Sequence, residues 1–146
     1  MIDPDDVNLL TQIGFLAASR GDAKRAEVIF GALLRVRAER AFPHIGLAMT
    51  WLNAGRAGDA VAHLRNVSLP DKEDNDLVQA FLGLALQLDA RASEAQRVLT
   101  SVAQTAENTH ATEGALLAQR LLGQSATTPQ TAHPTTGPSA FALGQR

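Results

Sequence analysis

The stretch GFLAASRGDAKRAEVIF at residues 14–30 is matched 34 residues later by AMTWLNAGRAGDAVAHL at residues 48–64. Small residues, large apolar residues and turn glycines fall at the same places in the two stretches: Gly14 with Ala48, Gly21 with Gly55, Ala26 with Ala60, and Phe30 with Leu64. A period of 34 residues is typical of helical hairpins that bury their apolar faces only by stacking on neighbours. The repeat therefore predicts an all-α chain that binds other molecules and does not act as a catalyst.

A third, degenerate copy follows with one residue inserted. Gly83, Ala95 and Leu99 stand at its small, small and large positions, whereas Ala90 replaces the turn glycine. Apolar periodicity and capping residues predict helices at residues 4–20, 23–37, 41–53, 57–67, 76–88, 93–106 and 111–122. The acidic run from Asp71 to Asp76 is expected to form a loop. The last predicted helix ends at Gly123 and should cap the final repeat.

The composition favours a single helical domain of modest charge. The chain has 146 residues, of which 45% are hydrophobic and 4% aromatic, with no cysteine and a net charge of −2. These values argue against a basic nucleic-acid binder, and no apolar run is long enough for membrane insertion. The acidic start MIDPDD lacks the features of a secretory signal. We therefore expect a cytoplasmic protein, with a periplasmic location reached by a signal-independent route as the alternative.

The composition changes after Gly123. Residues 124–146 contain five threonines and three prolines but no acidic residue. Such a segment carries too few apolar groups to bury and is expected to be disordered. The sequence thus predicts a helical repeat domain at residues 1–123 and a disordered Thr/Pro-rich tail at residues 124–146.

The spacing of small and large residues within each copy resembles the tetratricopeptide repeat. That repeat has small residues at its eighth and twentieth positions and a large residue at its twenty-fourth. Copies that begin at residues 7, 41 and 76 place there Gly14, Ala26 and Phe30, then Ala48, Ala60 and Leu64, then Gly83, Ala95 and Leu99. The prolines of the final position and most consensus aromatics are missing. The resemblance implies a solenoid of three hairpins followed by a capping helix.

Four segments also resemble a narrower family. They are LLTQIG at residues 9–14, GDAKRAE at 21–27, GRAGDA at 55–60 and AQRLLG at 118–123. Together they are similar to the HrpB/HrpK-type proteins of bacterial type III secretion systems, and more loosely to the tetratricopeptide chaperones of those systems. This resemblance covers residues 7–123 and implies a role in building or feeding the secretion apparatus.

The resemblance to the tetratricopeptide repeat also implies where a ligand would lie, namely on the first helix of each hairpin. The positions that line this groove carry no Lys or Arg, which a clamp for a terminal carboxylate would need. An apolar groove suits an amphipathic helix of a protein partner. The residues expected to bind it are Phe15, Phe42, Ile45, Met49, Leu52, Leu84 and Leu88. Self-association through the groove and simple burial within a tight superhelix are the alternatives.

Two classes of function follow from these expectations. The first is a chaperone or assembly factor that holds a subunit of the secretion system. The second is a structural, self-associating component of the apparatus, for which a periplasmic location in contact with peptidoglycan is an option.

Catalytic and metal-binding patterns are not evident. The four histidines are scattered without metal-ligand spacing, and His44 and His63 are expected to be solvated or capping residues. Gly21 and Gly55 are isolated turn glycines and do not form a phosphate loop. We expect no enzyme, no catalytic residues, no cofactor and no metal.

Overall fold

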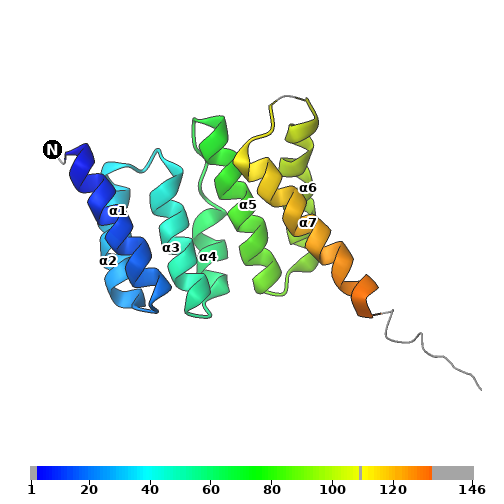
Figure 1. Ribbon diagram of the computed structural model, residues 1–146, viewed down its shortest axis with the longest axis horizontal. Helices are drawn as coiled ribbons and strands as arrows, with labels where there is room; N and C mark the ends of the chain where they lie inside the picture. Colours follow the sequence, from blue (N-terminus) through cyan, green and yellow to red (C-terminus); the bar gives the residue numbers. More distant parts are fainter. Residues whose placement is uncertain (1–2, 109, 133–146) are drawn as a thin grey trace, which may run out of the picture.

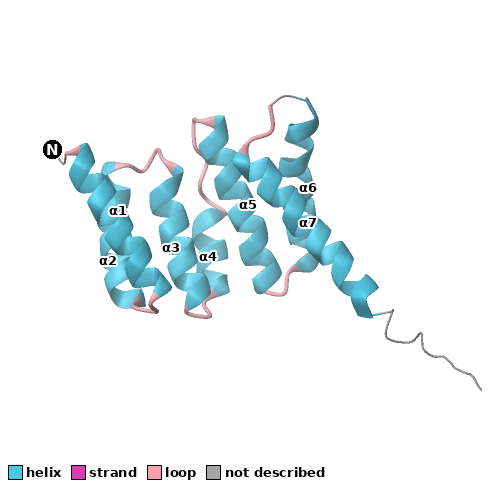
Figure 2. Cartoon of the chain, in the orientation of Figure 1, coloured by secondary structure: helices cyan, strands magenta, loops and turns pink. Residues whose placement is uncertain are grey.

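The computed structural model describes residues 3–108 and 110–132, and all of the regular secondary structure in these residues is helical (Figures 1 and 2). The helices are α1 (Pro4–Ser19), α2 (Ala23–Val36), α3 (Ala41–Asn53), α4 (Ala57–Leu64), α5 (Lys72–Leu88), α6 (Ala92–Asn108) and α7 (Glu113–Ala132). None of the helices in the described residues is long and apolar enough to cross a membrane.

The helices form two layers along a row that begins with α1 and α2 and ends with α6 and α7 (Figure 1). Each helix packs against the next one in the chain, and α1, α3, α5 and α7 also pack against one another in succession. Among the described residues, the backbones of α2, α4 and α6 stay apart, and ion pairs such as Arg56–Glu27 and Arg65–Glu94 link these helices at their ends. The odd-numbered helices therefore form a continuous layer, and the even-numbered helices form a separate, more open one.

Phe30 on α2 joins the first two hairpins and is fully buried. A Cβ atom on Gly14 of α1 would lie 2.9 Å from Phe30 Cζ, and one on Gly46 of α3 would lie 2.2 Å from Phe30 Cε1. Both helices therefore approach the phenyl ring through a residue without a side chain. Leu99 has the corresponding position in the third hairpin, where a Cβ on Gly83 would lie 2.3 Å from its Cδ2.

The turns within the three hairpins share one backbone conformation. Gly21, Gly55 and Ala90 have φ angles of 79°, 76° and 61°, all in the left-handed region. This region favours glycine because it brings a Cβ atom too close to the following carbonyl oxygen. The predicted replacement of the turn glycine by Ala90 is thus confirmed, and Ala90 adopts the left-handed conformation although it has a Cβ atom.

Three predicted helix ends are wrong. First, α4 ends at Leu64 instead of Val67, because the backbone after Leu64 forms tighter turns with hydrogen bonds between residues three apart. In one of them the Val67 N–H donates to the Leu64 carbonyl oxygen at 3.1 Å. Second, α5 begins at Lys72 instead of Asp76, because the Asp71 carboxylate caps the helix by accepting from the Asp74 backbone N–H at 3.0 Å.

The third correction concerns α7, which was expected to end at Gly123 but continues to Ala132. A glycine stops a helix when it turns into the left-handed region, and Gly123 is not among the residues with a positive φ angle. Residues 124–132 are therefore helical instead of disordered. Residues 133–146, the rest of the predicted tail, lie outside the described residues.

Helix α7 covers the end of the row as the predicted cap. It packs against both α5 and α6, and its Ala115, Ala118 and Leu121 are buried there. Gly114 allows the close approach, because a Cβ atom at this position would lie 2.4 Å from the carbonyl oxygen of Asp76.

Candidate partner-binding surface

The residues expected to bind a partner all lie on three odd-numbered helices. Phe15 is on α1, Leu84 and Leu88 are on α5, and α3 carries the other four: Phe42, Ile45, Met49 and Leu52. We call these seven residues the odd-helix strip. No member carries a charge, and they differ widely in exposure.

Ile45 is buried, with only 6% of its surface exposed, which does not fit the expectation that it contacts a partner. It belongs to a core cluster that also contains Val78 and Leu82 of α5. The physical reason is the direct packing of α3 on α5, which closes the seam at this position. Met49 and Leu52 pack partly against the same cluster and remain half-buried.

Other members of the strip also contribute to seams between helices. Phe15 makes an edge-to-face contact with Phe30, with ring centroids 4.8 Å apart. Leu84 packs partly against the cluster that α7 completes. Phe42 is half-buried, and Leu88 is 61% exposed at the end of α5. The accessible part of the strip therefore consists of the half-buried side chains and the open end at Leu88.

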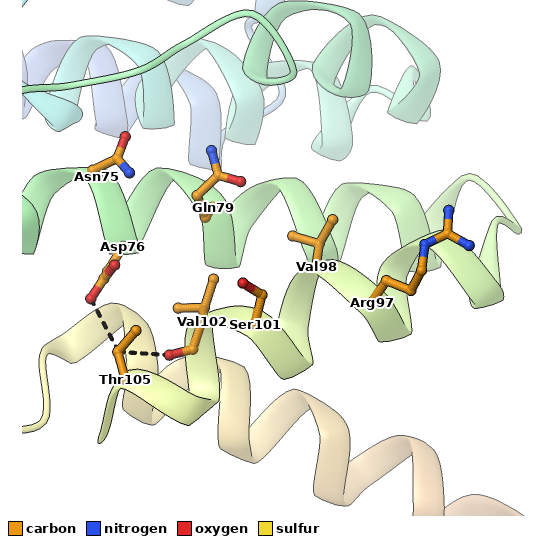
Figure 3. Close-up of a pocket in the computed structure, with 8 residues that line it drawn as sticks. All are labelled: Asn75, Asp76, Gln79, Arg97, Val98, Ser101, Val102 and Thr105. Carbon is orange, nitrogen blue, oxygen red and sulfur yellow. Dashed lines mark hydrogen bonds between the residues drawn. The ribbon is translucent and has the colours of Figure 1, made fainter. Parts of the chain in front are cut away.

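A hollow of ≈ 370 Å³ lies elsewhere, between α5 and α6, and its lining is mostly polar (Figure 3). Asp76 lies at one end of it and is tied to three helices. Its Oδ2 accepts from Lys72 Nζ at 2.8 Å and from Thr112 Oγ1 at 2.7 Å. The Thr105 hydroxyl is 3.4 Å away, but it is nearer to the Val102 carbonyl oxygen, at 2.7 Å. Asp76 therefore has a structural role.

Two further hollows lie on the first hairpin, one between α1 and α2 beside Ile13 and Leu16, the other beside Val28. None of these three hollows is lined by a residue of the odd-helix strip. The strip is a shallow surface and not a deep pocket.

His44 and His63 form a pair that the sequence analysis missed. His44 is buried, so the expectation of a solvated or capping residue is wrong for it. Its Nδ1 lies 2.9 Å from His63 Nε2, and its Nε2 lies 2.9 Å from the carbonyl oxygen of Ala38. A signal for this pair existed, because His44 lies ten residues before Ala54 and His63 nine residues after it, at similar heights on the two helices of the α3–α4 hairpin.

The hydrogen bonds assign the tautomers of this pair. The Ala38 carbonyl can only accept, so His44 carries a proton on Nε2 and accepts at Nδ1 from the Nε2–H of His63. Burial, and secondarily the nearby His44, lower the pKa of His63. His63 is therefore neutral near pH 7.

A second polar network joins α2, α3 and α4 around Trp51. The indole N–H of Trp51 donates to the Glu27 carboxylate, which also accepts from Arg56 at 3.1 Å. Arg56 in turn binds Asp59 at 2.8 Å. The network is satisfied within the chain and ties the first hairpin to the second.

The described residues contain no group of three or more His, Asp or Glu side chains that could hold a metal ion. No protein-family model matches the chain, and comparison with curated proteins and with solved structures finds no match.

Proposed function

We propose that this chain is a non-catalytic, tetratricopeptide-like module that binds an amphipathic segment of another protein on its odd-helix layer. The observation that carries the proposal is the odd-helix strip, a set of large apolar side chains that is uncharged throughout and opens to solvent at Leu88, which is 61% exposed. Exposed apolar surface of this kind typically marks a protein interface.

The two-layer packing supports a groove along this surface. The backbones of successive odd-numbered helices pack closely together, while among the described residues those of the even-numbered helices stay farther apart. A row bends toward the layer whose members are closer together, so the odd-numbered helices should line its concave side. The curvature of such stacks creates the extended binding surface that repeat proteins use.

The chemistry of the strip favours a helical ligand. A carboxylate clamp would need Lys or Arg, and the strip has neither. An amphipathic helix would instead insert spaced apolar anchors between half-buried side chains such as Phe42, Met49 and Leu52. On the resemblance of residues 7–123, we propose that the partner is a subunit of a bacterial type III secretion apparatus and that the chain is its chaperone or assembly factor.

The proposal is tested by isolating the tagged chain from its native host and identifying the protein that accompanies it. We expect Leu88→Asp and Met49→Asp to lose this partner, because each would place an unpaired charge in the contact. Val36→Asp is the matched control, since Val36 is 39% exposed on α2, outside the strip.

All three variants should first be compared with the wild type in denaturant melts. Retention of the partner by both folded strip variants would overturn the proposed site. Recovery of only further copies of the chain, lost with the same substitutions, would support self-association through the strip instead.

A further inference from the structure

A second apolar surface lies on α1, outside the odd-helix strip. Leu9, Ile13 and Leu16 are exposed by 56%, 39% and 49%, and their spacing of four and three residues places them on one face of the helix. These side chains are exposed because α2 and α3 pack elsewhere on α1, and α1 itself lies at the first end of the row (Figure 1). We call this surface the α1 face.

The same positions of the repeat are buried in the later copies. In α3 they are Pro43, Leu47 and Thr50, and in α5 they are Val78, Leu82 and Ala85, all of which are buried. In α3 and α5 this face packs on the hairpin that precedes it; Leu47, for example, shares a cluster with Phe30 and Leu33 of α2. The α1 face therefore has the apolar residues that stack on a neighbouring hairpin in the later copies, but in α1 they are exposed.

The α1 face is distinct from the surface proposed for the partner. Successive residues advance by about 100° around a helix, which separates Phe15 from Leu9, Ile13 and Leu16 by about 100–160°. The two surfaces can therefore be altered independently.

We propose that two copies of this chain pair through the α1 face, with the two α1 helices antiparallel about a two-fold axis. In one register of this pairing, the numbers of two residues that face each other across the axis add up to 25. Leu9 of one copy then faces Leu16 of the other. Asp5 then meets Arg20 of the other copy, twice. Among the described residues, neither Asp5 nor Arg20 forms an ion pair within the chain. The charges at the two ends of the face are thus complementary to a second copy.

The shape of the face is also suited to pairing. The hollow of ≈ 360 Å³ between α1 and α2 is lined by Ile13, Leu16 and Arg20, so it can receive a side chain from the opposite helix. A two-fold interface uses the same patch on both copies and closes into a dimer, whereas a head-to-tail contact would extend into a filament.

The other end of the row is less suited to pairing. Among the side chains described on α7, Leu116 is the only large apolar one that is exposed, and Gln119 and Arg120 beside it are polar. The asymmetry between the two ends favours pairing of α1 with α1 over stacking of α1 on α7.

The first experiment measures the mass of the full chain by sedimentation at concentrations from about 1 to 200 μM. We expect a dimer, and we expect Leu9→Glu combined with Ile13→Glu to give a monomer over the same range. Leu116→Glu is the matched control and should stay dimeric. A wild-type monomer at every concentration, or a dimer that survives the double substitution in a folded chain, would overturn the proposal.

The second experiment tests the register. Asp5→Arg alone and Arg20→Glu alone each create two like-charge contacts and should weaken the dimer by about tenfold. An equimolar mixture of the two variants restores both opposite-charge contacts and should form a heterodimer about as strong as the wild type. A mixture no stronger than its components would overturn the antiparallel pairing. Leu88→Asp should leave the dimer intact, which separates this proposal from that of the odd-helix strip.

Discussion

At the scale of single residues, polar side chains of this protein act as links between helices. The acidic run from Asp71 to Asp76 illustrates this. Asp71 caps its own helix, whereas Asp74 reaches back to the start of α3, where its Oδ2 accepts from the Ala41 backbone N–H at 3.0 Å and from Arg40 Nε at 2.7 Å. Asp76 joins α5 to α7 through Thr112. An acidic run that the sequence predicted to be a loop thus connects α5 to α3 and to α7.

The His44–His63 pair should make stability depend on pH. Because the pKa of His63 is lowered in the folded state, the unfolded chain binds more protons below its own pKa of about 6.5. The stability that neutral His63 contributes is therefore fully present above that pH, and it is lost as the pH falls toward the lower folded pKa of His63. Urea melts at a series of pH values between about 5 and 7.5 will measure this loss.

His63→Gln provides the control for this prediction. The glutamine amide can still donate to His44 Nδ1, but it does not titrate. The variant should lose less stability than the wild type on acidification. Equal losses in the two proteins would show that His63 is not responsible.

At the scale of helices, the close approach of α1 and α3 to Phe30 depends on glycine. We expect Gly46→Ala to destabilise the protein by about 2–3 kcal/mol, because the new methyl group would overlap a ring that is enclosed on both sides. This cost exceeds the gain of about 1 kcal/mol that alanine brings to a helix interior. The change in the free energy of unfolding is measured in denaturant melts.

Gly31→Ala on α2 is the matched control, since a Cβ atom there would meet nothing within 4 Å. It should stabilise the protein by about 0.5–1 kcal/mol through helix propensity alone. Similar effects of the two substitutions would argue against the tight packing at Gly46.

At the scale of the whole molecule, the two ends of the row differ in how they are covered. The last hairpin is closed by α7, which brings its Ala115 and Ala118 against Ala80 and Leu99. The first hairpin leaves the α1 face open. Repeat proteins generally depend on such terminal caps for solubility.

Two truncations should separate the capping part of α7 from the rest of the chain. Removal of all residues after Gly123 keeps Ala115, Ala118 and Leu121, so we expect the melting temperature to stay nearly unchanged. Removal of all residues after Asn108 uncovers the core cluster around Leu99 and should lower the melting temperature by more than about 5 °C. Thermal unfolding followed by circular dichroism measures the melting temperature of each truncated chain. A large drop in the melting temperature of the chain that ends at Gly123 would show that residues after Gly123 contribute to stability.

The sequence by itself determined the helical class, the repeat and most helix positions. These properties follow from local physics: the spacing of apolar residues, capping side chains such as Asp3 and Asp22, and the left-handed turns at Gly21 and Gly55. The small and large positions of the repeat also predicted the packed centre, because Ala26 and Phe30 are buried for the reason expected.

Only the tertiary structure decided which surface remained available. Whether Ile45 faces solvent depends on how closely α5 approaches α3. The exposure of Leu9, Ile13 and Leu16 depends on α2 and α3 packing elsewhere on α1. Likewise, the partners of His44 and Asp74 come from residues 19 and 33 positions away. Such contacts are set by the packing of whole helices, and the helical periodicity of a single segment does not contain that information.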